Sequence, residues 1–581
     1  MTTYHQTRWS MLLGALATGT ALSSGFVVPS FAEKIDSVNS APAAEFQTAT
    51  PIRHVVVIFQ ENASFDHYFG TYPTAPNLAG EPPFTPFAAT PTINGLSANQ
   101  PTSNVLNPPD VGALFTNNLN AVAPFRIDRI NAVSCDQDHN YSDEQKAVDG
   151  GLSDRFALAE GTGGTSAVGL GCQDAKGNNI PGFAMGYFDG NTVTGLWNYA
   201  QNFAMSDNSF GTQFGPSTPG AINLISGQTH GAVPGPSDTA NLSPGSLLPD
   251  GNGSFTLIND VDSGLDDCGN ATANVAFTDP KFKHTNVGDL LNAQGVTWGW
   301  FGGGFTPTVA ATGTSRAVCG STTIGHLAAP IPPGATAAQI NIPISNYNAH
   351  HTPFQYYAST VNPHHLPPTS TAAVGFTDQA NHQYDLSMFF TALAAGNMPA
   401  VSYLKAQNFQ DGHPGVGESD PLSEQNFLVN TINTIQQSPF WEDTAIIIAW
   451  DDSDGWYDHV NGPIVNASNS SADFLAGTNC GTPAAGAFPG RCGYGPRLPL
   501  LVVSPWAKAN FVDHNVSDQS SILRFIEENW NLGFIDGPTA PVKGQGSFDR
   551  VAGQLNGMFD FDNRPHLETV ILNPATGALV P

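Results

Sequence analysis

The chain has 581 residues, of which 40% are apolar and only 12% are charged, and its formal net charge is −29. The apolar share is ordinary for a globular protein. The negative charge argues against nucleic acids and anionic membranes as electrostatic partners, because both are polyanions. An anionic substrate would need a cation beside it.

The N-terminus has the features of a secretory signal peptide, which we place at residues 1–32. Arg8 supplies a positive charge, residues 11–28 are small and apolar, and residues 30–32 offer a small-x-small cleavage site. The alternative, a membrane anchor, is disfavoured because three glycines interrupt the apolar stretch. We therefore expect export and a secreted or periplasmic protein with no stable membrane insertion. Residues 33–51 would form a short mature leader.

The remaining chain, residues 52–581, shows no convincing domain boundary, so we expect one domain with long loop insertions. Strands alternating with helices predict an α/β fold with a parallel sheet. Pro-, Ala-, Ser- and Gly-rich segments predict loops at residues 73–124, 157–182, 229–253 and 466–487. The predicted strands and helices are, in chain order, a strand at 54–60, a helix followed by a strand within 285–301, a helix at 386–394, a strand at 400–406, a helix at 424–437, strands at 444–450 and 498–504, and a helix at 520–530.

Six cysteines in an exported chain predict disulfide bonds. Six cysteines allow fifteen pairings, so the sequence leaves the connectivity open. No C-x-x-C spacing occurs, which argues against a zinc or redox motif. The order of the cysteines suggests the neighbouring pairs Cys135–Cys172, Cys268–Cys319 and Cys480–Cys492.

Two buried strands end in oxygen-bearing side chains and predict a metal site. The run HVVVIFQ is followed by Glu61 and Asn62, and the run TAIIIAW is followed by Asp451 and Asp452. Ligands collect at the carboxyl ends of strands in open α/β sheets. If the two strands are neighbours, four oxygen ligands converge on one divalent cation, and the choice among Ca, Mg, Mn, Fe and Zn stays open. The simpler interpretation is that the two aspartates bind no metal and only cap a turn in DDSDG. An EF-hand is excluded because its helices and terminal glutamate are missing.

The segment GPSTPG at residues 215–220 offers a nucleophile. Pro219 suits the first turn of a helix, and Ser217 or Thr218 suits its N-cap, so plain capping is the simple alternative. A hydroxyl at a helix N-terminus beside a cation is suited to attack phosphorus. Ser217 is our candidate nucleophile, and the adjacent hydroxyl of Thr218 is the alternative.

Several of the 16 histidines lie in polar segments. Histidine can hold phosphoryl oxygens or protonate a leaving alcohol, although a structural role is common for any single one. We expect His364, His365 and His382 to be structural. The candidates in polar segments are His139, His351, His413 and His459.

These motifs resemble those of the bacterial phospholipase C / acid phosphatase phosphoesterase family, which is related to the alkaline-phosphatase superfamily. The likeness begins with IRHVVVIFQENASFDHYFGT and continues in order through DHNYSDEQ, GPSTPG, HHTPFQYY, DGHPG, DDSDGWYDHV and PRLPLLVVSPWAK. It implies an alkaline-phosphatase-like α/β fold and a phospho-enzyme intermediate. It further implies that Glu61, Asn62, Asp451 and Asp452 bind the metal, that Ser217 is the nucleophile, and that His139, His351 and His413 are active-site histidines.

The chain departs from the phospholipase pattern in ways that favour the acid phosphatase branch. Serine replaces threonine at position 217, Gly220-Ala221 replace Asn-Arg, and Asp452 stands where glutamate is common. The chain also ends soon after Leu532, where longer phospholipases add β domains. We therefore expect a phosphomonoesterase with an acidic optimum.

Two alternatives remain at this stage. One is a phospholipase C that cleaves phospholipid head groups, and the other is a non-catalytic secreted binding protein on this fold. Trp298, Trp300 and Phe301 would suit the first if they formed an aromatic wall for choline, although packing in a buried strand is the commoner role of such residues. The binding protein is disfavoured because all five proposed ligand and nucleophile residues are present.

Overall fold

The run of branched apolar residues at 54–60 forms β1 (His54–Gln60), which lies in the middle of an eight-stranded sheet. The computed structural model describes residues 47–96, 123–160, 182–235, 245–251, 253–324, 342–415, 418–539, 541 and 543–581. The sheet order is β14 (Gln383–Asp385), β11 (Trp298–Gly302), β15 (Val401–Lys405), β1, β16 (Thr444–Trp450), β17 (Leu500–Val503), β4 (Ala204–Ser206) and β18 (Phe511–Asp513).

The first five strands of this sheet are parallel to their neighbours. Strand β17 runs antiparallel to both β16 and β4, and β18 is parallel to β4. The prediction of an α/β fold with a mostly parallel central sheet is confirmed. The sequence pattern missed the reversal at β17, because β17 follows β16 through a long loop with no crossover helix, a connection that permits an antiparallel return.

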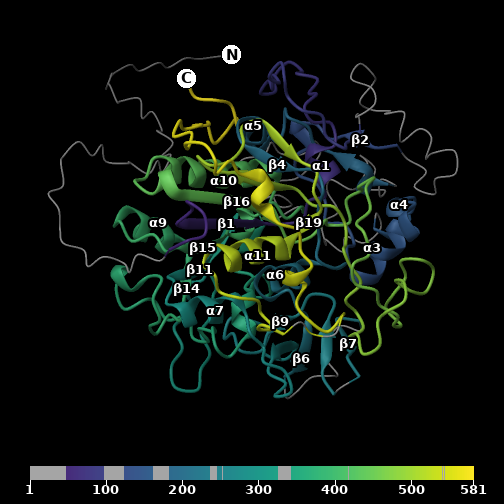
Figure 1. Ribbon diagram of the computed structural model, residues 1–581, viewed down its shortest axis with the longest axis vertical. Coiled ribbons are helices and arrows are strands. Elements are labelled where there is room, and N and C mark those ends of the chain that lie inside the picture. The colour runs from purple at the N-terminus through teal and green to yellow at the C-terminus, as the bar shows by residue number, and fades with distance from the viewer. Residues whose placement is uncertain are drawn as a thin grey trace, which may run out of the picture. The chain divides into compact units, whose positions relative to one another are not determined.

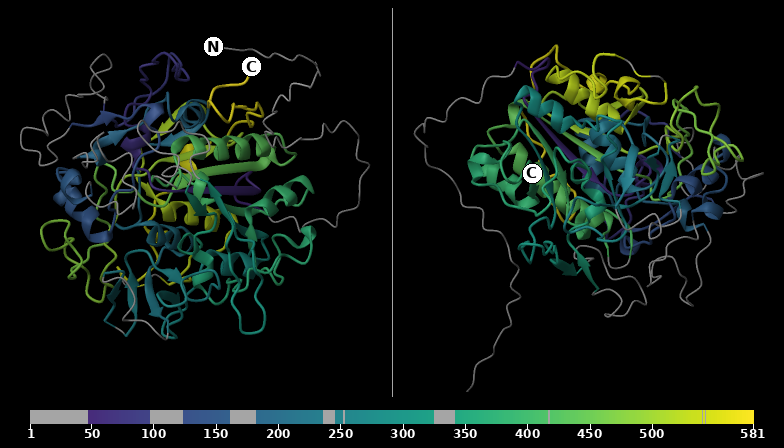
Figure 2. Two further views of the ribbon diagram at one scale, coloured as in Figure 1. Left: turned by 180° about the vertical axis from the view of Figure 1, so that it is seen from behind. Right: turned by 90° about the horizontal axis from the view of Figure 1, so that it is seen from below.

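Helices cover both faces of the central strands. Figure 1 shows α10 (Pro421–Gln436) on one side and α6 (Ser217–Ser226) with α11 (Gln519–Asn529) on the other. The view from behind in Figure 2 shows the same layering. The other helices are α1 (Phe65–Phe69), α3 (Tyr141–Val148), α4 (Phe156–Ala159), α5 (Thr194–Asn202), α7 (Val287–Gln294) and α9 (Leu386–Ala394).

A second, five-stranded sheet contradicts the loop predicted at residues 229–253. Its order is β7 (Leu247–Pro249), β8 (Phe255–Leu257), β6 (His230–Pro234), β10 (Asn274–Phe277) and β9 (Asp262–Ser263). These strands are two to five residues long, too short for an alternating pattern to be read from the sequence. Strand pairs β12 (Thr322–Ile324) with β13 (Pro343–Ser345), β5 (Ser209–Phe210) with β19 (Ser517–Asp518), and β2 (Phe125–Arg126) with β3 (Gly186–Tyr187) complete the described strands.

Helix boundaries follow local capping chemistry. The predicted helix at 424–437 begins earlier, because Asp420 caps the backbone N–H groups of Leu422 and Ser423 and Pro421 occupies the first turn. Helix α9 has the predicted bounds.

Two of the three expected disulfides, Cys268–Cys319 and Cys480–Cys492, are present. Cys172, the expected partner of Cys135, lies outside the described residues, as do the predicted signal peptide and most of the leader. Residues Phe46–Pro581 form one compact unit. Within the described ranges, no helix has both the length and the apolar character needed to cross a membrane.

Candidate active site

Strands β1 and β16 are parallel neighbours, as the metal-site prediction required. Their register pairs residues from His54 with Thr444 to Gln60 with Trp450. The next residues on the two strands, Glu61 and Asp451, therefore leave the sheet side by side. Strand β1 ends at Gln60, and Asn62 adopts the left-handed conformation (φ 57°), which asparagine tolerates better than most residues.

Helix α6 brings Ser217 to these strand ends. The predicted cap is wrong, because Pro216 is the N-cap residue and Ser217 is the first residue of the helix. The Ser217 hydroxyl is thereby free from capping. A Cβ atom at Gly220 would lie 2.1 Å from the carbonyl oxygen of Asp451, so glycine at this position lets the helix approach the strand end.

The Ser217 hydroxyl lies between two carboxylates. Its Oγ is 3.1 Å from Glu61 Oε2 and 3.1 Å from Asp452 Oδ2, and all three side chains are buried. The side chain of Asp451 turns toward the backbone, where its Oδ1 accepts hydrogen bonds from the N–H groups of Asn62 and Asp452. The four predicted ligands and the predicted nucleophile thus form one group of residues, which we call the strand-end cluster.

A buried lysine that the sequence analysis did not select joins this cluster. Lys405 is the last residue of β15, the other neighbour of β1, and its Nζ contacts Glu61 Oε1 and lies 3.3 Å from Asp451 Oδ2. Burial alone would lower the pKa of Lys405, but the charges of Asp451 and Glu61 outweigh burial and raise it. The strand-end rule that selected Glu61 and Asp451 applies equally to Lys405, so its signal was present in the sequence.

His139 and His413 lie on one side of the cluster. His139 Nε2 is 4.0 Å from Asp452 Oδ2, its Nδ1 is 3.6 Å from Asp454 Oδ1, and the rings of the two histidines are 6.4 Å apart. Burial opposes protonation of His139, but Asp452 and Asp454 raise its pKa well above the usual value. Burial likewise opposes protonation of His413, and Glu418 raises its pKa. Both rings are therefore suited to carry a proton.

His351 belongs to the cluster but has the opposite character. Its Nδ1 lies 3.0 Å from Glu61 Oε1 without hydrogen-bonding geometry, and Asn348 lies 3.0 Å from its Nε2. Burial, His350 and Lys405 lower the pKa of His351 well below the usual value. His351 is therefore better suited to act as a neutral ligand or hydrogen-bond partner than as the protonated acid that the sequence analysis allowed.

Residues next to His351 and Ser217 that the sequence analysis did not select also lie near the cluster. His350 faces Asp260 at 3.9 Å and Asp262 at 3.4 Å, and these carboxylates raise the pKa of His350 to about 9 against the effect of burial. Asp260 also accepts hydrogen bonds from the N–H and hydroxyl of Thr218. Thr218 is thus committed to Asp260, which leaves Ser217 as the hydroxyl that faces the carboxylates.

Other candidate residues lie outside the cluster. His459 pairs with Asp66 instead. Trp298, Trp300 and Phe301 are fully buried in β11, where Trp298 stacks on His382, so they form part of the core and not a wall of the site. His365 lies beside the Cys268–Cys319 disulfide.

The donor set of the strand-end cluster fits a hard divalent cation. Three carboxylates, an amide and a hydroxyl offer oxygen atoms, and His351 adds one nitrogen atom beside Glu61. Asn62 Oδ1 is buried and has no hydrogen-bond partner among the described residues, which is costly unless something else binds it. Burial and the charge of Glu61 raise the pKa of Asp451 to about 6.

Comparisons with known proteins identify the family. The model of the Phosphoesterase family matches residues 52–533, so the chain belongs to this family and is a phosphoric ester hydrolase. Phospholipase C A of Mycobacterium tuberculosis is 24% identical over 91% of this chain and 81% of its own length. Non-hemolytic phospholipase C of Pseudomonas aeruginosa is 28% identical over 29% of this chain, a match that spans only 24% of that protein. Among solved structures, a protein in the alkaline phosphatase superfamily from Vibrio parahaemolyticus matches 60% of this chain and 64% of its own, with 12% identity and a TM-score of 0.25.

Proposed function

We propose that this protein is an exported phosphomonoesterase of the acid phosphatase type, which depends on one divalent cation and uses Ser217 as its nucleophile. The observation that carries the proposal is the position of the Ser217 hydroxyl. It begins a ten-residue helix and lies 3.1 Å from two of the carboxylates that end or follow the central strands. The positive end of the helix dipole favours both an alkoxide and a phosphoryl group at this point.

Glu61, Asn62, Asp451 and Asp452 are the residues that would hold the cation. When bound, it would neutralise phosphoryl charge and favour the deprotonated form of a neighbouring hydroxyl. The oxygen donors of these four residues admit Mg, Mn and Ca, and less readily Fe or Zn. Lys405 would offset part of the negative charge of Glu61 and Asp451 on one side of this group.

The side chains suit a two-step displacement. Ser217 Oγ gives its proton to the adjacent carboxylate of Asp452 and attacks phosphorus, and the bond from phosphorus to the ester oxygen breaks. His413 or His139 donates a proton to the departing alcohol. Water then attacks the phosphoserine, which restores the Ser217 hydroxyl and releases phosphate.

Two features support a monoester over a choline diester. The three aromatic residues that might have formed a choline site are buried in the core. The positively charged groups near Ser217, which include Lys405, His139 and His413, suit the greater negative charge of a monoester. The names of the two phospholipase C relatives favour the alternative, cleavage of phospholipid head groups.

Hydrolysis of p-nitrophenyl phosphate and p-nitrophenyl phosphocholine by the purified protein separates the two functions. We expect faster hydrolysis of the monoester, loss of both activities with a chelator, and recovery when a divalent cation is added. Activity should fall on the alkaline side as the histidine acid loses its proton. A clear preference for the phosphocholine diester would establish the alternative, and full activity in chelator would contradict the role of the cation.

A further inference from the structure

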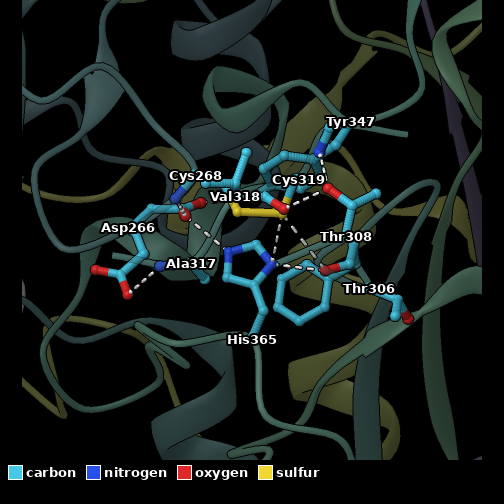
Figure 3. The surroundings of a disulfide bond; sticks show 12 residues. Asp266, Cys268, Thr306, Thr308, Ala317, Val318, Cys319, Tyr347 and His365 are labelled. Atoms are coloured by element: carbon cyan, nitrogen blue, oxygen red, sulfur yellow. Dashed lines mark hydrogen bonds and ion pairs between the residues drawn. A yellow bond between two sulfur atoms is a disulfide. The ribbon is translucent and has the colours of Figure 1, made fainter. Parts of the chain in front are cut away.

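The Cys268–Cys319 disulfide has a charged environment that a purely structural crosslink does not need. Figure 3 shows the His365 ring beside the sulfur atoms, with one ring nitrogen near the disulfide and the other facing Asp266. His365 Nδ1 lies 3.4 Å from Cys319 Sγ, and His365 Nε2 lies 2.7 Å from Asp266 Oδ1. The imidazole of His365 therefore contacts the sulfur of Cys319 through one nitrogen and the carboxylate of Asp266 through the other.

The contacts of His365 orient the ring as a donor at both nitrogens. Nε2 faces the Asp266 carboxylate, and Nδ1 also lies 2.7 Å from the carbonyl oxygen of Phe305. Both oxygens accept hydrogen bonds, so the ring faces an acceptor at each of its two nitrogens. The ring is held in place because it stacks on Phe305 at 3.9 Å and is fully buried.

Asp266 is fixed from its other side. Its Oδ2 accepts the hydroxyl proton of Tyr347, and its Oδ1 accepts the backbone N–H of Cys268. The carboxylate therefore connects the histidine with the second cysteine. The two sulfur atoms are equivalent in the covalent bond, and both lie within 4.8 Å of a His365 ring nitrogen, but the contact at 3.4 Å is with Cys319 Sγ.

We propose that this disulfide is a thiol-exchange site that accepts small thiols at Cys268. A thiolate attacks Cys268 Sγ, a new bond forms between the two sulfurs, and the Cys268–Cys319 bond breaks. The bonding electron pair leaves on Cys319 Sγ as a thiolate, which the adjacent His365 stabilises. A positive charge beside a cysteine stabilises its thiolate, and a more stable thiolate is a better leaving group.

The two disulfides differ in solvent exposure, and the proposed exchange site is the more exposed of the two. Cys268 and Cys319 are partly exposed, and Val318 next to Cys319 is 50% exposed. Cys480 and Cys492 are both fully buried, and no described imidazole contacts either sulfur. The second disulfide is therefore an internal control in the same molecule.

The test treats the folded, oxidised protein with low concentrations of glutathione, traps free thiols with iodoacetamide, and maps both modifications by mass spectrometry. We expect glutathione on Cys268 and the alkyl label on Cys319, with both appearing before any label on Cys480 or Cys492. Exposure alone would not choose between the two partly exposed sulfurs. Glutathione on Cys319, an even distribution over both sulfurs, or equally fast labelling of Cys480 and Cys492 would overturn the proposal.

A pair of variants tests the histidine directly. His365→Gln should slow the exchange at least about threefold, because the leaving thiolate loses the imidazole that contacts Cys319 Sγ. His364→Gln changes the adjacent, 56% exposed histidine and should leave the rate unchanged. Equal rates in wild type and a folded His365→Gln protein would contradict the mechanism. If that variant fails to fold, the labelling pattern of the wild type still decides the question.

Discussion

Two clusters of buried acidic residues follow the same two strands, β1 and β16, and they are compensated in different ways. The strand-end cluster comes directly after the strands. The second, which we call the arginine cluster, contains Asp66, Asp458, His459 and Arg497. Both bring carboxylates together out of water, so their difference shows what separates a structural charge network from a candidate cation site.

In the arginine cluster, the carboxylates form ion pairs with positively charged groups of the protein. Arg497 Nε is 3.0 Å from Asp458 Oδ1, Arg497 Nη2 is 2.9 Å from Asp66 Oδ1, and His459 Nδ1 is 2.6 Å from Asp66 Oδ2. Burial alone would raise the pKa of Asp66, but His459 and Arg497 lower it below the usual value. Two positive groups thus face two carboxylates, although burial still raises the pKa of Asp458 to about 6.

The strand-end cluster lacks this balance. Lys405 contacts two of its three carboxylates, those of Glu61 and Asp451, and among the described residues the third, Asp452, has only His139 as an ion-pair partner, at 4.0 Å. Burial raises the pKa of Asp452 well above its usual range, and the opposing effect of His139 does not cancel this shift. Because uncompensated buried charge costs free energy, this difference fits our proposal that a cation from outside the chain completes the strand-end cluster.

The largest expected effect separates chemistry from cation binding. Ser217→Ala should reduce p-nitrophenyl phosphate turnover by at least about 10³-fold, because the covalent route is lost. Cation binding, measured by calorimetry, should persist. Ser226→Ala, at the other end of α6, is the matched control and should retain most of the activity. Comparable activity in Ser217→Ala and wild type would transfer the nucleophile role to another residue.

One aspartate from each cluster should give opposite results. Asp451→Asn should lose cation binding and activity while the fold is retained. Asp458→Asn should leave Arg497 with an incomplete partner and lower the free energy of unfolding by about 3–5 kcal/mol, the typical cost of breaking a buried ion pair. Its activity per folded molecule should stay close to wild type. If both variants lost only stability, the distinction between the clusters would fail.

Lys405→Met tests the one internal cation of the strand-end cluster. Removing its ammonium takes away the positive charge that faces Glu61 and Asp451, so divalent cations should bind at least about tenfold more tightly by simple electrostatics. Calorimetric titration measures the change. Lys146→Met, which removes a partly exposed lysine paired with Asp143, is the control. Weaker binding in Lys405→Met would show that the lysine mainly holds the ligands in place.

The smallest predicted effect is a pH dependence of stability. In cation-free protein the pKa of Asp451 is raised to about 6 by burial and Glu61, so the folded state holds a proton that the unfolded state has already lost. Stability should therefore fall as pH rises from about 4 to about 6, by roughly 1–3 kcal/mol. An added divalent cation should remove this fall, as thermal unfolding at several pH values would show. A cation-free protein whose stability rises over this window would contradict the assignment.

The arginine cluster predicts the opposite sign at lower pH. Because the pKa of Asp66 is lowered in the folded protein, its stabilising contribution is present above the unfolded pKa and is lost as pH falls through the folded value. Asp66→Asn should flatten this acidic part of the stability curve.

The central strands were predictable because each is a continuous buried run that ends at polar residues. Thr444–Trp450 has the predicted bounds, and its pairing with β1 brings Asp451 beside Glu61. Parallel strands in the interior need no alternating pattern and give a strong signal. The same rule could have selected Lys405 at the end of β15, since it identifies positions without regard to the sign of the charge.

Other features depend on contacts that have no local signal. The short strands of the second sheet are defined by partners far along the chain, and the protonation of His139 and His351 is set by opposite neighbours. The helix start at Ser217 depends on how α6 packs against the strand end through Gly220. The sequence could therefore select the residue types of the site but not their charge states.

The most direct test of the central claim is to locate the covalent intermediate. The protein is mixed with p-nitrophenyl phosphate, quenched in acid during turnover, and mapped by peptide mass spectrometry. The account predicts a phosphate group on Ser217 in the wild type and none in Ser217→Ala. Phosphate on a different residue, or sustained turnover with no phosphorylated peptide across rapid quench times, would contradict it.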